Sequence, residues 1–220
     1  MVQAKIIKDD IRYLLFADIY TKYSEPKTRR KAFAILESAI ATFDKKGFEN
    51  VTLTMIARES GVTRQLLNHY FESLNELRAL ALKYIRVIGQ RIVVNAIPTD
   101  APADQMLKGY FEAHQFWARN YKVHLRVWLG FLNSCAKNKS DREMNIVSVA
   151  AGTNRLEELL KAGKASGIFT VPDAREAARL IQTLMLGWLV SSLTEDDGIN
   201  SSQLETSVVK ECLRIAGAKA

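Results

Sequence analysis

The segment TLTMIARESGVTRQLLNHYF, at residues 52–71, constrains the fold more than any other part of the chain. Two short helical patterns meet there at Gly61 and Val62, a pair that suits a tight turn. Thr52 and Thr63 each precede one of these patterns and suit the N-cap position. The spacing predicts a helix-turn-helix, although a helical hairpin with a solvated polar face has the same spacing.

The second helix of this pair divides its side chains between two faces. Leu67 and Phe71 are four residues apart and should pack inward. The polar side chains should point outward, where Arg can pair with guanine, Gln or Asn with adenine, and Thr with phosphate. The surface is therefore predicted to bind double-stranded DNA. The expected DNA contacts are Arg30, Thr52, Thr63, Arg64, Gln65, Asn68, His69 and Tyr70.

The rest of the chain predicts an all-α fold. Its 220 residues include only 11 Gly and 4 Pro, and apolar residues recur at helical spacing. The further helices are expected at about 9–23, 27–46, 73–94, 102–119, 121–137, 140–166, 173–194 and 201–216. Pro98 and Pro102 mark a break between two domains. The predicted parts are an N-terminal extension at 1–28, a helix-turn-helix domain at 29–95, and a second helical domain at 96–220.

The net positive charge is concentrated in the first part of the chain. Residues 1–91 hold 16 Lys and Arg against 10 Asp and Glu, whereas residues 92–220 hold 15 against 14. A basic surface near the helix-turn-helix would attract phosphate. Two Cys are too few for a disulfide framework, and neither a signal peptide nor an apolar membrane span is visible. We expect a cytoplasmic protein with no membrane association.

The span from Arg30 to Leu77 resembles the DNA-binding domain of the tetracycline-repressor (TetR) family of bacterial regulators. The resemblance rests on an Ala and a Phe in the preceding helix, a Gly-Phe pair, a capping Thr, an Ile-Ala pair, a Gly-Val-Thr turn, a late aromatic residue and a Ser-x-x-Glu-Leu cap. These are Ala39, Phe43, Gly47, Phe48, Thr52, Ile56, Ala57, Gly61, Val62, Thr63, Phe71, Ser73, Glu76 and Leu77. The resemblance implies a helix-turn-helix whose second helix enters the major groove.

The chain departs from the family pattern at two positions. Asn68 stands where the family commonly has a Tyr that touches phosphate, and Leu74 stands where it commonly has a phosphate-contacting Lys. Each lost phosphate contact should reduce the salt dependence of binding by roughly one counterion. The basic run at residues 29–31, which includes Arg30, could compensate for these losses.

The N-terminal extension is longer than is usual in the family, and two interpretations remain open. It could be an arm that follows DNA through Lys5, Lys8 and Arg12. Alternatively it is an extra helix that packs on the body or on a partner chain. Acidic residues interrupt its basic character, which favours the packing helix. The apolar residues expected to pack are Ile11, Leu14, Leu15 and Ile19.

The resemblance implies that the C-terminal domain forms a homodimer and holds a small molecule. Two apolar stripes on the last two helices fit such a dimer: Leu180, Leu184, Gly187, Trp188 and Ser191 on one, and Leu204, Val208, Cys212 and Ile215 on the other. A pocket for a small apolar or aromatic ligand is predicted from Phe111, His114, Trp117, Trp128, Phe131, Cys135, Met185 and Trp188. The alternative is an ordinary core, because an aromatic stripe at helical spacing belongs to a core more often than to a ligand site.

These features favour a ligand-responsive repressor that binds a near-palindromic operator as a homodimer. An architectural or cell-cycle DNA-binding dimer, with a protein partner in place of a small ligand, is the alternative. No catalytic residues, metal ligands or cofactor motifs are predicted, because the three His lie in unrelated contexts and no phosphate-binding glycine loop is present. An enzyme is therefore not expected.

Overall fold

The computed structural model describes residues 7–97, 100–194 and 201–218, and within these ranges the chain is helical. The described part contains no β-strand, only an isolated bridge between Phe169 and Ala218. The all-α prediction is confirmed. Lys5 of the predicted arm and Pro98 of the predicted domain break lie outside the described residues.

The chain divides into two compact units. The N-terminal unit comprises the described part of Lys5–Ile92 together with Tyr121–Asn138. The C-terminal unit comprises the described parts of Val93–Asn120 and Lys139–Ala220. The segment Tyr121–Asn138, which the sequence assigns to the second domain, therefore groups with the helix-turn-helix.

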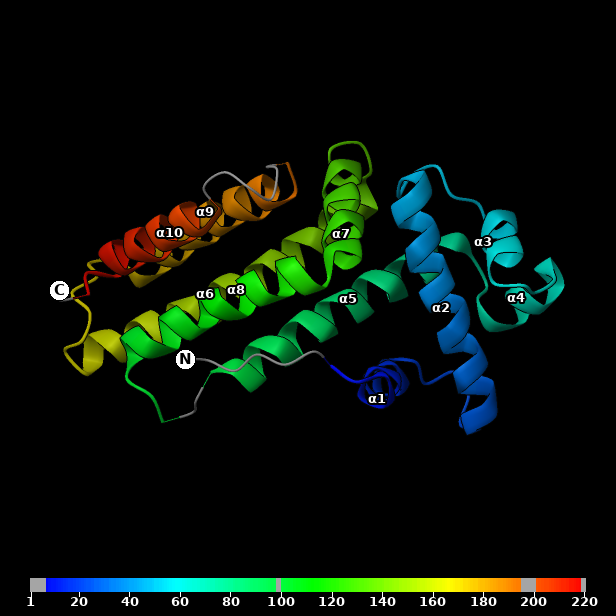
Figure 1. Ribbon diagram of the computed structural model, residues 1–220, viewed down its shortest axis with the longest axis horizontal. Coiled ribbons are helices and arrows are strands. Elements are labelled where there is room, and N and C mark those ends of the chain that lie inside the picture. The colour runs from blue at the N-terminus through cyan, green and yellow to red at the C-terminus, as the bar shows by residue number, and fades with distance from the viewer. Residues whose placement is uncertain (1–6, 98–99, 195–200, 219–220) are drawn as a thin grey trace. The chain divides into compact units, whose positions relative to one another are not determined.

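The N-terminal unit is built on two long helices that carry the helix-turn-helix. Its helices are α1 (Asp9–Ile19), α2 (Pro26–Lys46), α3 (Leu53–Glu59), α4 (Arg64–Tyr70), α5 (Leu74–Ala96, which continues past the end of the unit) and α7 (Lys122–Cys135). Helices α1, α3 and α7 all pack on α2, and α4 packs on α3 (Figure 1). The largest fully buried side chains of this unit are aromatic and include Phe16, Phe43, Phe71 and Tyr84.

Helix boundaries in this unit follow the capping residues. Gly47, at φ 84°, ends α2. The Ser73 hydroxyl accepts a hydrogen bond from the Glu76 amide at 3.0 Å, as the predicted cap of α5 requires. The Glu76 carboxylate accepts in turn from the amide of Glu72. Local sequence signals of this kind explain why the end of α2 and the start of α5 lie close to their predicted positions.

Helix α1 is shorter than predicted and packs through different residues. It ends at Ile19, four residues before the expected end. Leu15 and Phe16 are buried, whereas Leu14 is 57% exposed and Ile11 is also exposed. Ile11 and Leu14 therefore do not pack on the body of this chain, and their packing on a partner chain stays a prediction. The side of α1 that faces α2 carries Phe16, whose ring lies 5.3 Å from that of Phe33 on α2.

The C-terminal unit is a bundle of four long helices, α6 (Ala103–Asn120), α8 (Lys139–Ala165), α9 (Ala174–Thr194) and α10 (Ser201–Ala216) (Figure 1). Helix α8 packs on α6 and α9, and α10 packs on α6 and α9. Gly163 permits a close approach inside this bundle, because a side chain there would meet the ring of Phe169 at 2.1 Å. Thr153 on α8 donates to the amide oxygen of Gln182 on α9, which ties the two helices together.

Candidate nucleic-acid interface

The two short helices of the predicted motif are each capped by a threonine hydroxyl. Thr52 accepts from the Met55 amide at 3.3 Å at the start of α3. Thr63 accepts from the Leu66 amide at 3.1 Å at the start of α4. Gly61 lies between the helices with a φ of 65°, a left-handed conformation that favours glycine. The turn and both caps were predicted from the sequence.

Buried apolar side chains hold the two helices of the motif in place on their inward-facing side. Ile56 and Ala57 of α3 and Leu67 of α4 are buried, as is Phe71 directly after α4. Val62 is half-buried in the turn, and its amide donates to the Ala57 carbonyl at 3.0 Å. Both inward-facing positions predicted for α4 are therefore occupied by core residues.

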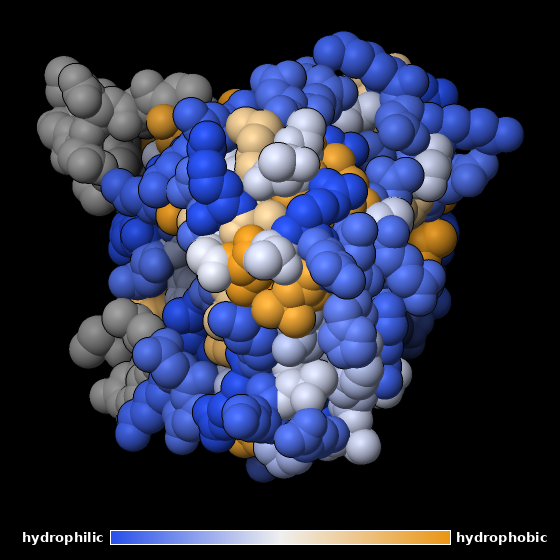
Figure 2. Space-filling model, turned by 90° about the vertical axis from the view of Figure 1, so that its right-hand side faces the viewer, coloured by the Kyte–Doolittle hydropathy of each residue, from blue (hydrophilic) through white to orange (hydrophobic). Residues whose placement is uncertain are grey.

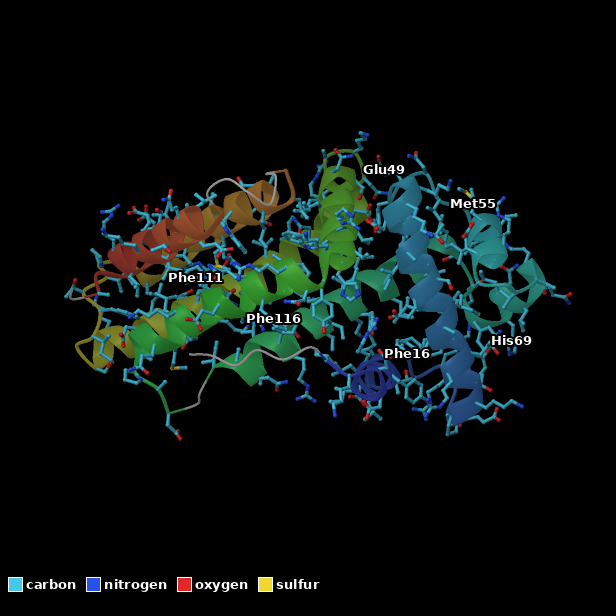
Figure 3. All side chains as sticks on the ribbon, in the orientation of Figure 1. Phe16, Glu49, Met55, His69, Phe111 and Phe116 are labelled. Carbon is cyan, nitrogen blue, oxygen red and sulfur yellow. The ribbon has the colours of Figure 1, made fainter. Side chains whose placement is uncertain are left out.

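The opposite face of α4 is polar and open to solvent. Its exposed side chains are Thr63, Arg64, Gln65, Leu66, Asn68 and His69. Met55 and His69 are labelled on α3 and α4 in Figure 3, and the side of the molecule that carries these helices is mostly hydrophilic in Figure 2. The five polar residues among them all belong to the eight DNA contacts that the sequence predicts.

Arg64 is held in place by two neighbours. Its Nε donates to Asn68 Oδ1 at 3.1 Å, and another guanidinium nitrogen lies 3.5 Å from the Thr54 hydroxyl on α3. Thr54 is not among the DNA contacts expected from the sequence. The signal for it is its position one residue into α3, two residues after the capping Thr52.

Tyr70 and Leu66 are placed differently from what the sequence suggests. Tyr70, an expected DNA contact, is only 8% exposed, and its ring lies edge-on to that of Tyr23 at 6.0 Å between centroids. Leu66, which was not among the expected contacts, is 38% exposed. A methyl-bearing side chain on this face could contact the methyl group of thymine.

Arg30 lies near the start of α2, outside the motif. It is exposed, and its guanidinium carbon lies 4.4 Å from the centre of the Tyr13 ring on α1. A cation over an aromatic face is attracted by the ring electrons. The side chain of Arg30 thus rests on α1 with its charge available to solvent.

The residues predicted for a ligand pocket are divided between the two units. Phe111, His114, Trp117, Met185 and Trp188 belong to α6 and α9 of the C-terminal unit, and Phe111 is labelled in Figure 3. Trp128, Phe131 and Cys135 belong to α7 of the N-terminal unit. In that unit the Phe131 ring meets Phe48 edge-on at 5.9 Å, and Cys135 Sγ donates to the Phe131 carbonyl at 3.2 Å.

Within the C-terminal unit, Tyr110 and His114 form an aromatic pair one turn apart on α6. Their ring centres are 4.4 Å apart, and His114 Nδ1 lies 2.7 Å from the Tyr110 carbonyl oxygen. Burial, together with the positive charge of Arg155, lowers the pKa of His114 to about 4, although the Tyr110 carbonyl opposes the shift. Burial raises the pKa of Tyr110 to about 12. Both side chains are therefore neutral near pH 7.

The apolar stripes predicted for a dimer are partly used inside the chain. Trp188 of α9 and Val208 and Cys212 of α10 are buried within the C-terminal unit. Other apolar side chains remain exposed on α8 and α9. They are Ile146, Val147, Val149, Leu180, Leu186 and Val190.

Among the described residues, no helix is long and apolar enough to cross a lipid bilayer. In the same part of the chain, no three His, Cys, Asp or Glu side chains are grouped so that they could hold a metal ion.

Comparison with known proteins matches residues 35–80 to a family model described as bacterial regulatory proteins, tetR family. Curated relatives extend the similarity beyond this segment. The HTH-type transcriptional regulator BetI of Serratia proteamaculans is 25% identical over 166 residues, which cover 72% of this chain and 79% of that protein. BetI of Pseudomonas fluorescens is 28% identical over 171 residues, covering 74% and 81% respectively.

Solved structures share the fold along most of the chain. A putative transcriptional regulator from Saccharomonospora viridis, crystallised in complex with choline, superposes with a TM-score of 0.75 at 20% identity and covers 86% of this chain and 98% of its own. A putative transcriptional regulator from Pseudomonas aeruginosa PAO1 superposes with a TM-score of 0.72 at 20% identity, covering 94% and 95%. At this level of identity the likeness concerns the fold alone.

Proposed function

The chain belongs to the TetR family of bacterial regulatory proteins and is a DNA-binding transcriptional regulator, and from this premise we propose that it is a ligand-responsive repressor that binds its operator as a homodimer. The observation that carries the proposal is that one face of α4 is polar and exposed, whereas its opposite face is apolar and buried. The curated relatives named above are also transcriptional regulators, so we prefer this function to the architectural dimer.

In this proposal α4 enters the major groove and its side chains have distinct roles. Arg64 and Gln65 contact base edges, with Arg64 suited to guanine and Gln65 to adenine. Leu66 contacts a thymine methyl group, and Thr63 a phosphate. Thr52 and Arg30 also contact the phosphate backbone. Tyr70 supports α4 from inside because its ring is buried.

The proposed dimer brings two copies of α4 to successive half-sites. Half-sites that are read from one side of the duplex lie about 34 Å apart, which one copy of a seven-residue helix cannot span. The exposed apolar side chains of α9 support a dimer surface there, since Leu180 is 52% and Val190 is 41% exposed. Gly187 lies between them, and a side chain at its position would meet nothing within 4 Å, which leaves room for a second helix.

We place the ligand site of this proposal in the C-terminal unit, among the aromatic residues of α6 and α9. Tyr110 and His114 are neutral there, and the positive charge of Arg155 acts on both. That charge disfavours a cationic ligand beside this pair, so we expect a neutral apolar or aromatic molecule. To change DNA affinity tenfold, the ligand must favour one conformation by about 1.4 kcal/mol.

The DNA part of the proposal is tested by binding selection on fragmented genomic DNA from the bacterium that encodes the chain. Selected fragments are then titrated with full-length protein at 50 and 200 mM salt. We expect a shared site with two inverted half-sites and an affinity that falls steeply with salt. Binding that is equal for selected and random fragments would refute sequence-specific regulation.

The ligand part is tested by thermal unfolding with choline and with its uncharged isostere 3,3-dimethyl-1-butanol. The isostere keeps the shape of choline and removes its charge. A neutral apolar site is stabilised by the isostere at least as strongly as by choline. Stabilisation by choline alone would contradict our assignment, because an aromatic site selective for a cation would then be present.

A further inference from the structure

The N-terminal extension reaches the end of the helix that reads DNA. We define residues 7–23 as the N-terminal brace, which comprises Ile7, Lys8, helix α1 and the segment that leads from α1 to Tyr23. These residues precede the segment 35–80 that matches the family model. The brace itself therefore lies outside the matched segment, whereas the α4 residues that it contacts lie inside it.

Two tyrosine hydroxyls of the brace donate hydrogen bonds to the last residues of α4. Tyr20 donates to the Tyr70 carbonyl at 2.9 Å, and Tyr23 donates to the His69 carbonyl at 2.7 Å. Carbonyls in the last turn of a helix have no partner within the helix itself. The brace thus supplies the hydrogen bonds that this end of α4 lacks.

Ring contacts reinforce these hydrogen bonds. The ring of Tyr20 stacks on Phe16 at 5.0 Å and lies 5.7 Å from Phe71, the C-cap residue directly after α4. The ring of Tyr23 lies 5.2 Å from that of His69. Burial raises the pKa of the Tyr20 hydroxyl above its usual value of 10. This hydroxyl therefore stays protonated and remains a hydrogen-bond donor. Phe16 is labelled in Figure 3.

The other end of the brace is anchored on the body of the N-terminal unit. Arg12 forms an ion pair with Glu37 on α2, and its Nε donates to the Tyr84 hydroxyl on α5 at 3.3 Å. The amide of Ile7 donates to the Tyr121 hydroxyl, just before α7, at 2.9 Å. Both ends of the brace are therefore fixed, so α4 cannot move relative to the rest of the unit without breaking contacts of the brace.

Helix α4 needs such support because it is short. It has seven residues, and isolated helices of fewer than about 12–15 residues are marginal in water. Only Leu67 and Tyr70 of α4 are buried. Contacts outside the helix therefore decide how stably its polar face is presented.

We propose that Tyr20 and Tyr23 are positioning residues for DNA reading, and that the N-terminal brace holds α4 in the orientation that fits the major groove. The inference rests on the proposed function, in which α4 reads bases. The brace acts through α4 and does not itself touch DNA. It is a fixed support within each subunit, distinct from an arm that follows the duplex.

The test uses full-length Tyr20→Phe, Tyr23→Phe and the double variant, with Tyr13→Phe as matched control. Tyr13 also lies on the brace and donates its hydroxyl to a carbonyl, but that carbonyl belongs to Pro26 at the start of α2, 3.3 Å away. Each variant removes one hydroxyl and keeps the ring. Amide hydrogen exchange in α4 is measured on free protein, and affinity is measured for selected and random DNA.

We expect the exchange of the α4 amides to accelerate about three- to tenfold for each hydroxyl removed from Tyr20 or Tyr23. Affinity for selected DNA falls by a similar factor, whereas affinity for random DNA is unchanged, so the ratio of the two drops. Tyr13→Phe changes neither quantity. A loss of global stability alone would lower both affinities together and leave their ratio intact.

Unchanged α4 exchange and an unchanged affinity ratio in the double variant would overturn the proposal. If the double variant unfolds, Tyr23→Phe decides alone, because its hydrogen bond is exposed and its loss perturbs the core least. Failure of the wild-type protein to prefer any DNA would instead refute the proposed function. The exchange measurement on free protein would then still show whether the brace supports α4.

Discussion

The Nε of Arg64 donates to Oδ1 of Asn68 one helical turn further along α4, with 3.1 Å between the two atoms. Together with the Thr54 hydroxyl, this contact limits the rotamers of a long and flexible cation. Arg binds guanine through a planar fork, and a side chain that is already ordered loses less entropy on binding. Asn68, which stands where the family commonly has Tyr, therefore orients Arg64 in the free protein.

Arg64 and Gln65 are expected to carry base preference. Arg64→Ala and Gln65→Ala should each cost roughly 1–3 kcal/mol at the preferred base and much less at the wrong one. Affinity for a set of operators with single base changes measures both effects. If Gln65→Ala leaves the preference unchanged at every position, the orientation proposed for α4 is incorrect.

Asn68 is expected to act through Arg64. Asn68→Ala should weaken operator binding about three- to tenfold in the wild-type background, because the hydrogen bond that orients Arg64 is exposed and contributes about 1 kcal/mol. The same change should have little effect when Arg64 is already Ala. A double-mutant cycle on operator affinity gives the coupling directly. Additive effects would mean that Asn68 contacts DNA independently of Arg64.

The helix-turn-helix could be predicted from sequence because its signals are local. Thr52 and Thr63 cap the helices that follow them, Gly61 adopts the left-handed turn, and the inward position of Leu67 follows from helical spacing. Each of these features depends on residues within one or two turns of one another. The outward polar face of α4 follows from the same spacing.

The support of α4 could not be predicted, because it depends on residues far apart in the chain. The hydrogen bond from Tyr20 to the Tyr70 carbonyl joins positions 50 residues apart, and no local pattern specifies it. The burial of Tyr70 and the exposure of Ile11 follow from how α1 packs. The same holds for α7, whose contacts with α2 group it with the helix-turn-helix.

The two N-caps are expected to contribute stability as well as position. Thr63→Ala and Thr52→Ala should each lower the free energy of unfolding by about 1 kcal/mol, since each leaves an amide at a helix start without its partner. Thr52→Ala should also weaken binding to all DNA sequences alike. Urea unfolding and affinity measurements check both effects. Thr52→Ser is the control, because it keeps the capping oxygen; a loss of stability as large as that of Thr52→Ala would contradict the capping role.

The exposed apolar face of α9 is expected to hold the dimer. Leu180→Glu and Val190→Glu introduce a charge at positions that are 52% and 41% exposed in the single chain. Burying such a charge at an interface is costly, so sedimentation velocity should show monomers at micromolar concentration. Val94→Glu is the control, since Val94 is an exposed apolar residue of α5 outside the proposed face. Dimers that survive both α9 substitutions would place the interface elsewhere.

Part of the loss of folding stability at acid pH is expected to come from His124 of α7. This residue is 5% exposed, and burial, with a smaller effect from the charge of Arg12, lowers its pKa from 6.5 to about 4. The rings of Tyr84 and Tyr121 lie 6.0 and 5.4 Å from that of His124.

Between pH 6.5 and about 4 the unfolded chain binds a proton at His124 that the folded chain does not. The free energy of unfolding therefore falls as the pH drops through this window, by up to about 3 kcal/mol for this residue. His124→Phe keeps an aromatic ring and removes the titration, so its urea unfolding should depend less on pH over the same window. An identical pH dependence in wild type and variant would show that His124 is charged in the folded protein at a normal pKa.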